Sequence, residues 1–311
     1  MMLPFLSTIL ILADLSCSSR GFIIEISDSD ALKPDLLQLA QSLNLTACVS
    51  QLKSAGIERI INHEGPFTIF CPIDDAFSRQ VVYPGSAKMQ DKMLQHCGKG
   101  LITSDMFTNE LIVNSLLKGR SIRVNVYTAG PFSTETVNGQ AVIESDHMAR
   151  NGVIHIIYSV MESVYPSPGS VIGELGMCCD GTTQLLAFIR LAGLFQVLDN
   201  TEPITLLAPS DSAWAKLGSA FLNHLDKDIN LLRRVILSHV LQGTWYSVGL
   251  SRGDTIKTLS GYKVKIEKDK NGVVSFSGAR STLADVAARN GAVYVVDEVI
   301  IPKEIFKGRN F

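Results

Sequence analysis

Two aspartates and two histidines recur in matching surroundings, and they are the first residues whose chemistry suggests a site. Asp74 precedes His96 in the first half of the chain, and Asp211 precedes His239 in the second half. A carboxylate beside an imidazole can move a proton, which raises the hypothesis of acid–base catalysis. A hydrolase would also need a nucleophile and an oxyanion site, and the sequence has no Gly-x-Ser-x-Gly elbow. We therefore expect no enzyme: each aspartate should cap the helix that follows it, and the histidines should be buried and hydrogen-bonded.

Patterns that hold metals or cofactors are incomplete. His63-Glu64 lacks the second histidine of a zinc-binding helix, and the adjacent Cys178 and Cys179 do not form a tetrahedral set on their own. No glycine-rich phosphate loop stands between a strand and a helix. The sequence thus predicts neither a metal nor a cofactor. The formal net charge of -2 gives no reason to expect nucleic acid as a partner.

The start of the chain predicts export. Leu3–Leu12 is an apolar run that is too short to span a bilayer but suits the core of a signal peptide, which we place at residues 1–19. No later segment is long and apolar enough for a membrane span, and the polar residues 303–311 do not resemble a lipid-anchor signal. We expect a secreted protein of the extracellular space or matrix. Asn44-Leu45-Thr46 is then a candidate N-glycosylation sequon.

Cysteine usage fits an oxidising compartment but does not give the connectivity. An odd number of cysteines follows the signal peptide, so at least one thiol is free or pairs with another chain. One bridge within the first half is expected, whereas the two adjacent cysteines suit pairing elsewhere, or no pairing, better than pairing with each other. The candidates are Cys48, Cys71, Cys97, Cys178 and Cys179.

An internal repeat is the most informative feature of the sequence. Phe67–Phe77 matches Ile204–Trp214, which aligns the two aspartates named above with each other. Ala149–Gly152 recurs letter for letter as Ala288–Gly291. Between these blocks, the segments that contain the two histidines align at a slightly larger spacing, as an insertion in the second half would cause. Three blocks in one order indicate a duplicated domain, as the length of 311 residues also suggests.

The repeat sets the predicted domains at residues 33–165 and 171–305, joined by a short proline-containing linker at 166–170. Each copy begins with helical periodicity and ends with alternating, β-rich segments, so the fold class is α+β. Helices are expected at Pro34–Leu52, Thr183–Leu198 and Ile229–Leu241, and strands at Phe67–Cys71, Ile204–Ala208, Tyr262–Lys268, Val273–Phe276 and Ala292–Ile301.

These blocks resemble the fasciclin domain, which occurs singly or in tandem in secreted and surface adhesion proteins. The resemblance rests on a strand followed by Pro-x-Asp-x-Ala-aromatic, on a helix ending in histidine, and on an Asn-Gly turn before the closing strand. It implies two tandem domains, each a wedge-shaped β-sandwich or antiparallel sheet flanked by N-terminal helices, that act in adhesion without catalysis. The motif residues are Asp74, His96, Asn151, Gly152, Asp211, His239, Asn290 and Gly291.

The family's adhesive motifs transfer only in part. One resembles Glu-Pro-Asp-Ile-Met, and here Glu144, Asp146 and Met148 match it, while the second copy offers Asp285. A carboxylate can complete the shell of a metal ion in a receptor, as in integrins. The alternative is that the two aspartates cap a short helix before the turn. A second motif needs tyrosine before the histidine, where this chain has Gln95 and Ser238.

The resemblance implies an integrin-like receptor, collagen or a glycosaminoglycan as partner. The lysines of the alternating segment could contact a sulfated glycan, although a solvated strand face is the commoner explanation. They are Lys263, Lys265, Lys268 and Lys270. The alternative function is a secreted carrier of a small apolar ligand, which would need a lined pocket.

Overall fold

The computed structural model describes residues 33–63, 65–79, 88–129, 131–162, 169–177, 179, 181–201 and 203–302. The predicted signal peptide and most of the predicted linker lie outside these residues. The described residues after Lys33 belong to one compact unit that contains both copies of the repeat. None of the helices among the described residues has the length and apolar content that crossing a membrane requires.

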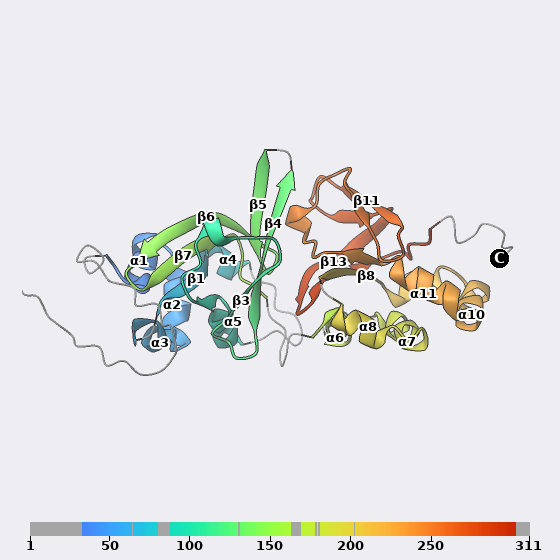
Figure 1. Cartoon of the computed structure of the whole chain (residues 1–311), viewed down its shortest axis with the longest axis horizontal. Helices are drawn as coiled ribbons and strands as arrows, with labels where there is room; N and C mark the ends of the chain where they lie inside the picture. Colours follow the sequence, from blue (N-terminus) through green and yellow to red (C-terminus); the bar gives the residue numbers. More distant parts are fainter. Residues whose placement is uncertain are drawn as a thin grey trace, which may run out of the picture. The chain divides into compact units, whose positions relative to one another are not determined.

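The first copy begins with helices and continues as a sheet, as the sequence predicts (Figure 1). Its elements are α1 Leu36–Ser42, α2 Thr46–Ser54, α3 Ile57–His63, β1 Phe67–Pro72, α4 Asp74–Ser78, α5 Met89–Gln95, β2 Cys97–Lys99, the 3-10 helix η1 Ser104–Met106, β3 Leu111–Asn114, β4 Ser121–Ala129, β5 Phe132–Val137, β6 Gln140–Ala149 and β7 Gly152–Ile157.

The second copy repeats this order. Its elements are α6 Val171–Met177, α7 Thr183–Leu191, α8 Phe195–Asn200, β8 Ile204–Pro209, α9 Asp211–Ala215, α10 Ser219–Lys227, α11 Ile229–Leu237, β9 Val240–Gln242, the 3-10 helix η2 Ser247–Gly249, β10 Thr255–Lys257, β11 Lys263–Lys268, β12 Val274–Phe276, β13 Ala279–Ala288 and β14 Gly291–Val296.

Each copy has one seven-stranded sheet, with the order β2-β1-β7-β6-β5-β4-β3 in the first and β10-β11-β12-β13-β14-β8-β9 in the second. The predicted α+β class is therefore confirmed. The sheets are mixed, however, because β1 pairs parallel with β7, and β8 with β14. Single bridges, Gly98 to Ser115 and Leu241 to Thr258, join the two edges, so each sheet nearly closes on itself.

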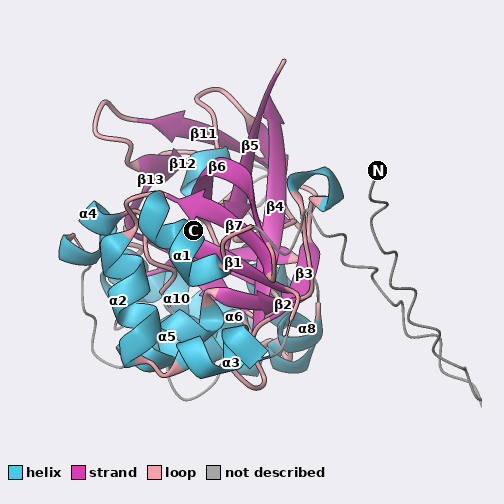
Figure 2. Cartoon of the chain, turned by 90° about the vertical axis from the view of Figure 1, so that its left-hand side faces the viewer, coloured by secondary structure: helices cyan, strands magenta, loops and turns pink. Residues whose placement is uncertain are grey.

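The core lies on both sides of the central strands. Helices α2, α3 and α5 gather beside β1 and β2 (Figures 1 and 2), and their apolar side chains pack with Ile69 and Cys71. Phe70 points the other way and packs inside the curved sheet with Val124 and Ile157. Because both faces are covered, β1, β7, β8 and β14 are buried at every residue, which explains their continuous apolar runs.

The predicted helices are shorter than the sequence suggests. Pro34–Leu52 is two helices separated at Asn44, whose φ is 60°, and Thr183–Leu198 is interrupted at Gly193, whose φ is 65°. A left-handed residue stops the i to i−4 hydrogen bonds even where the apolar periodicity continues. The predicted helix Ile229–Leu241 ends at Leu237 because the chain then joins the sheet as β9.

Candidate functional site

Asp74 and Asp211 cap helices, but not the helices predicted from the sequence. Asp74 accepts hydrogen bonds from the hydroxyl of Thr46 and from the backbone N–H of Ala47 at 2.8 Å, in the first turn of α2. Asp211 does the same for α7 through Thr183 and the residue after it. The prediction that each aspartate caps the helix it begins is therefore wrong, since the N-cap positions of α4 and α9 are the residues just before them. The sequence motif joins two helices that lie apart in the chain.

The two histidines are buried and hydrogen-bonded, as predicted. His96 Nδ1 lies 2.7 Å from the carbonyl of Lys92, and His96 Nε2 accepts from the N–H of Met161 at 2.9 Å. His239 has the same two kinds of partner, the carbonyl of Val235 and the N–H of Ile300. Burial lowers the pKa of both imidazoles to about 4, so they are neutral at physiological pH. Both ring nitrogens of each histidine are therefore bonded to backbone groups. Through Nε2, each imidazole fixes the segment that follows the last strand of its copy, at Met161 or Ile300.

The Asn-Gly motifs join the helices to the sheet. Asn151 accepts from the N–H of Leu36 at 2.9 Å and donates to the carbonyl of Ile61 at 2.7 Å. Asn290 makes equivalent bonds to the backbone of α6 and α8. A Cβ on Gly152 would lie 2.0 Å from the carbonyl oxygen of Phe67, so only glycine fits against the neighbouring strand. The motif residues therefore have structural partners.

The candidate adhesive segment lies on β6, at an irregularity in its pairing with β7 between Glu144 and His147. Asp146 has a φ of 64° and accepts from the N–H of Ser104 at 2.8 Å and from the Ser104 hydroxyl. The predicted alternative of a short helix at this point is wrong, because the segment is a strand. Asp146 instead accepts from the first residue of the distant 3-10 helix η1, Ser104.

The second copy has the same bulge. Asp285, with a φ of 60°, accepts from the N–H of Ser247 at 2.6 Å and from the Ser247 hydroxyl, and it also accepts from the hydroxyl of Tyr294 at 2.8 Å. Tyr294 takes the place of His155, which accepts from the N–H of Asp146 in the first copy. Both aspartates therefore have internal donors on both carboxylate oxygens.

Two other residues of the β6 segment face outward. The side chain of Glu144 is 61% exposed and lies 3.1 Å from His147 Nε2, and Met148 is 40% exposed. Glu144 thus keeps one carboxylate oxygen open to a partner. The strand presents an acid and a flexible apolar side chain four residues apart, on a backbone that Asp146 fixes.

The predicted first-half disulfide forms between Cys48 and Cys71 and links α2 to β1. Cys97 is buried, its thiol donates to the carbonyl of Met93, and burial raises its pKa to about 12. Cys179 is buried as well, and Cys178 lies outside the described residues. Asn44 is exposed, but the hydroxyl of Thr46 in its sequon is bonded to Asp74.

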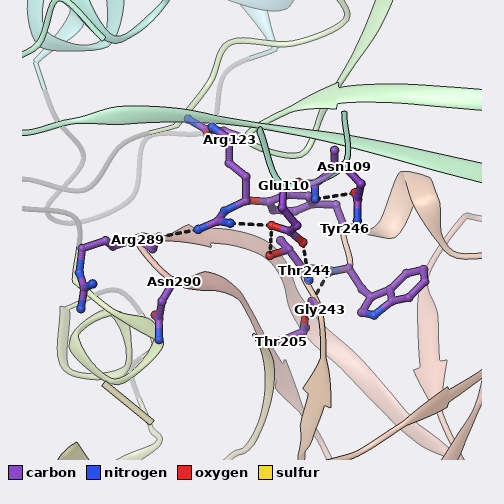
Figure 3. Close-up of polar contacts among 12 residues, drawn as sticks. Asn109, Glu110, Arg123, Thr205, Gly243, Thr244, Tyr246, Arg289 and Asn290 are labelled. Carbon is purple, nitrogen blue, oxygen red and sulfur yellow. Dashed lines mark hydrogen bonds and ion pairs between the residues drawn. The ribbon is translucent and has the colours of Figure 1, made fainter. Parts of the chain in front are cut away.

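A polar cluster between the two copies was not predicted from the sequence (Figure 3). Glu110 and Arg123 of the first copy form an ion pair of 2.5 Å, and their side chains are only 20% and 6% exposed. Glu110 also accepts from the N–H of Thr244 at 3.0 Å and from its hydroxyl at 3.1 Å, while Arg123 donates to the carbonyl of Arg289 at 2.7 Å. One buried ion pair therefore bonds to two segments of the second copy.

Aromatic side chains extend this contact. The hydroxyl of Tyr127 donates to the carbonyl of Thr244 at 3.0 Å and accepts from the N–H of Tyr246 at 3.2 Å. The Tyr127 ring stacks on Trp245 with a centroid distance of 5.7 Å. A Cβ on Gly249 would lie 2.3 Å from the Tyr127 ring, so the contact requires glycine there. Burial raises the pKa of Tyr127, which keeps its hydroxyl protonated.

One sequence feature could have indicated this cluster. When His96 is aligned with His239, Glu110 corresponds to Gly253, and both residues have positive φ, 67° and 96°. Glutamate, unlike glycine, is disfavoured at positive φ, and nothing in the neighbouring sequence accounts for its presence at this position. The reason is its contact with the other copy, which the repeat alone does not reveal.

Comparisons with known proteins give one family. The fasciclin domain matches residues 43–163 and 180–302. Transforming growth factor-beta-induced protein ig-h3 of Sus scrofa is 26% identical over 248 residues, covering 77% of this chain and 35% of that protein. Periostin of Homo sapiens is 24% identical over 266 residues, covering 85% of this chain and 30% of that protein. The chain thus spans roughly a third of the length of these relatives.

Among solved structures, a FAS1 domain pair from the insect cell adhesion molecule fasciclin I matches with a TM-score of 0.41 and 18% identity. The match covers 84% of this chain and 99% of that one.

Proposed function

Because the chain belongs to the fasciclin-domain family, we propose that it is a secreted protein of the extracellular matrix or cell surface that adheres through protein–protein contacts, without catalysis. The family resemblance supports this kind of function. The environment of the candidate catalytic groups supports it too, since His96 and His239 are fully buried and bonded to backbone. Asp74 and Asp211 are likewise engaged as caps of α2 and α7.

The observation that carries the proposal is the exposed pair Glu144 and Met148 on β6. Binding of a partner here should cost little conformational entropy in the strand. The Asp146 carboxylate already fixes the backbone between the two residues through its bonds to Ser104. Glu144 supplies a carboxylate and Met148 an adaptable apolar contact. We assign the contact to these two residues, and the positioning of the strand to Asp146.

An integrin-like receptor is the partner that this chemistry fits best. The open oxygen of Glu144 can complete the coordination shell of a receptor-bound divalent cation, because such ions bind carboxylate oxygens. When the two bulge aspartates, Asp146 and Asp285, are aligned, the corresponding positions of the second copy are Leu283 and Ala287, which carry no acid. In the second copy, Asp285 therefore positions the strand, but no acid stands at the position of Glu144. Collagen and a glycosaminoglycan are the other candidate partners.

A secreted carrier of a small apolar ligand is the second candidate function, but no observation favours it. Two grooves of the described residues, of about 510 and 560 Å³, are lined by many polar or charged side chains, including Arg234, Lys263, Asp254 and Lys257. An apolar carrier site should instead be mostly apolar with a few polar groups.

Cell attachment to surfaces coated with the purified chain tests the proposal. Glu144→Gln and Met148→Ser should each reduce attachment several-fold. Glu267→Gln is the matched control, because it also removes an exposed acid from a strand without touching β6. Asp146→Asn should reduce attachment to a smaller extent, since it keeps the left-handed residue but weakens the bonds to Ser104. If the three β6 variants all attach like the wild type, the assignment to β6 is wrong.

A further inference from the structure

A groove in the second copy is lined by positive charges and hydroxyl groups. It lies where the end of α11 meets the turn between β10 and β11, and its volume is about 510 Å³. No aspartate or glutamate among the described residues lines it. The side chains that line it come from Arg234, Ser238, Ser260, Tyr262, Lys263 and Pro302.

The cations at this groove have no partner in the part of the chain that the structure describes. Arg234 and Lys263 are both exposed. Lys257 stands directly opposite Lys263 in the pairing of β10 with β11, and like charges in that position destabilise a sheet. By contrast, Lys265 pairs with Glu267, and Lys268 donates to the carbonyl of Ser247. Among the described lysines of β10 and β11, the two without a partner, Lys257 and Lys263, therefore lie at the groove and its rim.

Hydroxyl groups supply hydrogen-bond donors beside these charges. Ser260 Oγ lies 3.1 Å from Ser238 Oγ and 2.9 Å from Thr258 Oγ1. The hydroxyls of Ser238 and Thr258 donate to carbonyl oxygens, those of Arg234 and Tyr262. Ser260 is exposed and can turn its proton toward a bound anion, while the other two hydroxyls keep their internal acceptors. Charge-assisted donors of this kind are the usual ligands of tetrahedral oxyanions.

At the corresponding place the first copy has an acid where the groove has Arg234. When His96 is aligned with His239, Arg234 corresponds to Asp91, Lys257 to Asn114 and Lys263 to Arg120. Arg120 has favourable electrostatic interactions with Asp91 and Glu174. Carboxylates of the chain thus neutralise the cation at this position in the first copy, whereas the described residues leave the position positive in the second copy.

We propose that the groove at Arg234 and Lys263 binds the sulfate or phosphate ester group of an extracellular molecule. Arg234 and Lys263 would hold the charge, Ser260 would donate to an ester oxygen, and Lys257 would attract further anionic groups of a polyanion. The site lies in the second copy and uses none of the residues of the β6 segment. It can therefore fail while the proposed adhesion stands, and the reverse also holds.

Isothermal titration of the full chain at about 0.15 M ionic strength tests the proposal with three probes. They are a sulfated heparin hexasaccharide, the same sugar after desulfation, and an inorganic polyphosphate of similar charge. The sulfated sugar should bind and the desulfated sugar should not. Polyphosphate binding as tight as that of the sulfated sugar would identify the general oxyanion as the ligand, and weaker binding would identify the sulfate ester.

Matched variants locate the site. Arg234→Gln and Lys263→Gln should each weaken binding of the sulfated sugar about tenfold, as expected for loss of one charge-assisted bond. Lys265→Gln removes an exposed charge of the same strand that already has a partner, and it should weaken binding less than about twofold. All three side chains are exposed, so unchanged thermal unfolding should accompany each substitution. Absence of binding by both anions, or an equal loss in Lys265→Gln, would overturn the proposal.

Discussion

Glu110 accepts both the backbone N–H and the hydroxyl proton of Thr244, a residue 134 positions later in the chain. The same carboxylate pairs with Arg123, which in turn donates to a carbonyl of the second copy. A buried ion pair is worth little by itself, because desolvation offsets the attraction between the charges. Its value here lies in the directional bonds that reach the other copy, and these bonds are lost if the copies separate.

Removing one member of this pair should be more destabilising than removing both. Glu110→Ala leaves the Arg123 guanidinium buried without a counter-charge, and we expect the free energy of unfolding to fall by about 3–5 kcal/mol. Glu110→Leu combined with Arg123→Met should recover a large part of that loss, because no buried charge is then left unpaired. Urea denaturation followed by tryptophan fluorescence measures both changes.

The exposed pair of Asp75 and Arg79 is the control for the prediction on Glu110. Its side chains are 77% and 41% exposed, so Asp75→Ala should change the free energy of unfolding by less than about 1 kcal/mol. If Glu110→Ala costs no more than Asp75→Ala, then the buried cluster does not hold the two copies together in solution.

Gly249 should not tolerate a side chain. Its Cβ would lie 2.3 Å from the ring of Tyr127, and two hydrogen bonds hold that ring in place. Gly249→Ala should therefore lower the free energy of unfolding by about 1–3 kcal/mol, the usual cost of overpacking. Limited proteolysis of the chain should also become faster, because the contact between the copies is lost first.

Gly173 gives the matched substitution in open space. It lies inside helix α6, and apart from its chain neighbours and the backbone of that helix no described atom comes within 4 Å of the Cβ that alanine would add. Gly173→Ala should raise stability by about 0.5–1 kcal/mol, because glycine loses more backbone entropy in a helix. Equal effects of the two substitutions on proteolysis would show that Gly249 has no special role in the contact.

The repeat made most of the fold predictable from one sequence. The Pro-x-Asp block, the helix ending in histidine and the Asn-Gly turn located two α+β copies and their order along the chain. The predicted roles of His96 and His239 were correct because a histidine on an apolar helix face has few ways to satisfy its nitrogens. The disulfide between Cys48 and Cys71 was within the predicted set, although the sequence did not select it.

Long-range partners were not predictable in the same way. Local sequence shows that Asp74 follows a strand and begins a helix, but it does not show that α2 lies within reach of the carboxylate. The same limit applies to Asp146, whose partner Ser104 lies 42 residues away. The parallel pairing of β1 with β7 also depends on closure of the whole sheet. These contacts follow from packing, which periodicity and spacing do not describe.

In the first copy, the disulfide should contribute to stability, whereas the free thiol of Cys97 should be unreactive in the folded protein. Reducing the bond between Cys48 and Cys71, which are 23 residues apart, should lower the free energy of unfolding by about 3 kcal/mol. Cys97 is buried with a pKa raised to about 12, so it has almost no thiolate at neutral pH. A thiol reagent followed by peptide mass mapping should label Cys97 only after the chain is unfolded. Rapid labelling of Cys97 in the native protein would contradict the buried position.

Stability should fall as the pH drops below about 6.5, because of His96 and His239. Burial lowers the pKa of both folded imidazoles to about 4, whereas an unfolded histidine has a pKa near 6.5. Above pH 6.5 the two states bind the same number of protons at these residues. Between about 4 and 6.5 the unfolded chain binds more, so each histidine should reduce the free energy of unfolding by up to about 1.4 kcal/mol per pH unit.

Urea denaturation at pH 7.5, 6.5, 5.5 and 5.0 measures this slope, and His239→Gln identifies its source. The substitution leaves the N–H of Ile300 without its imidazole acceptor, so the variant should be less stable at every pH. Its dependence on pH between 6.5 and 5.0 should nevertheless be shallower than that of the wild type, since the protonation of His239 in the unfolded chain is removed. A wild-type free energy of unfolding that stays constant over this range, or an unchanged slope in His239→Gln, would show that the buried imidazoles do not control the pH response.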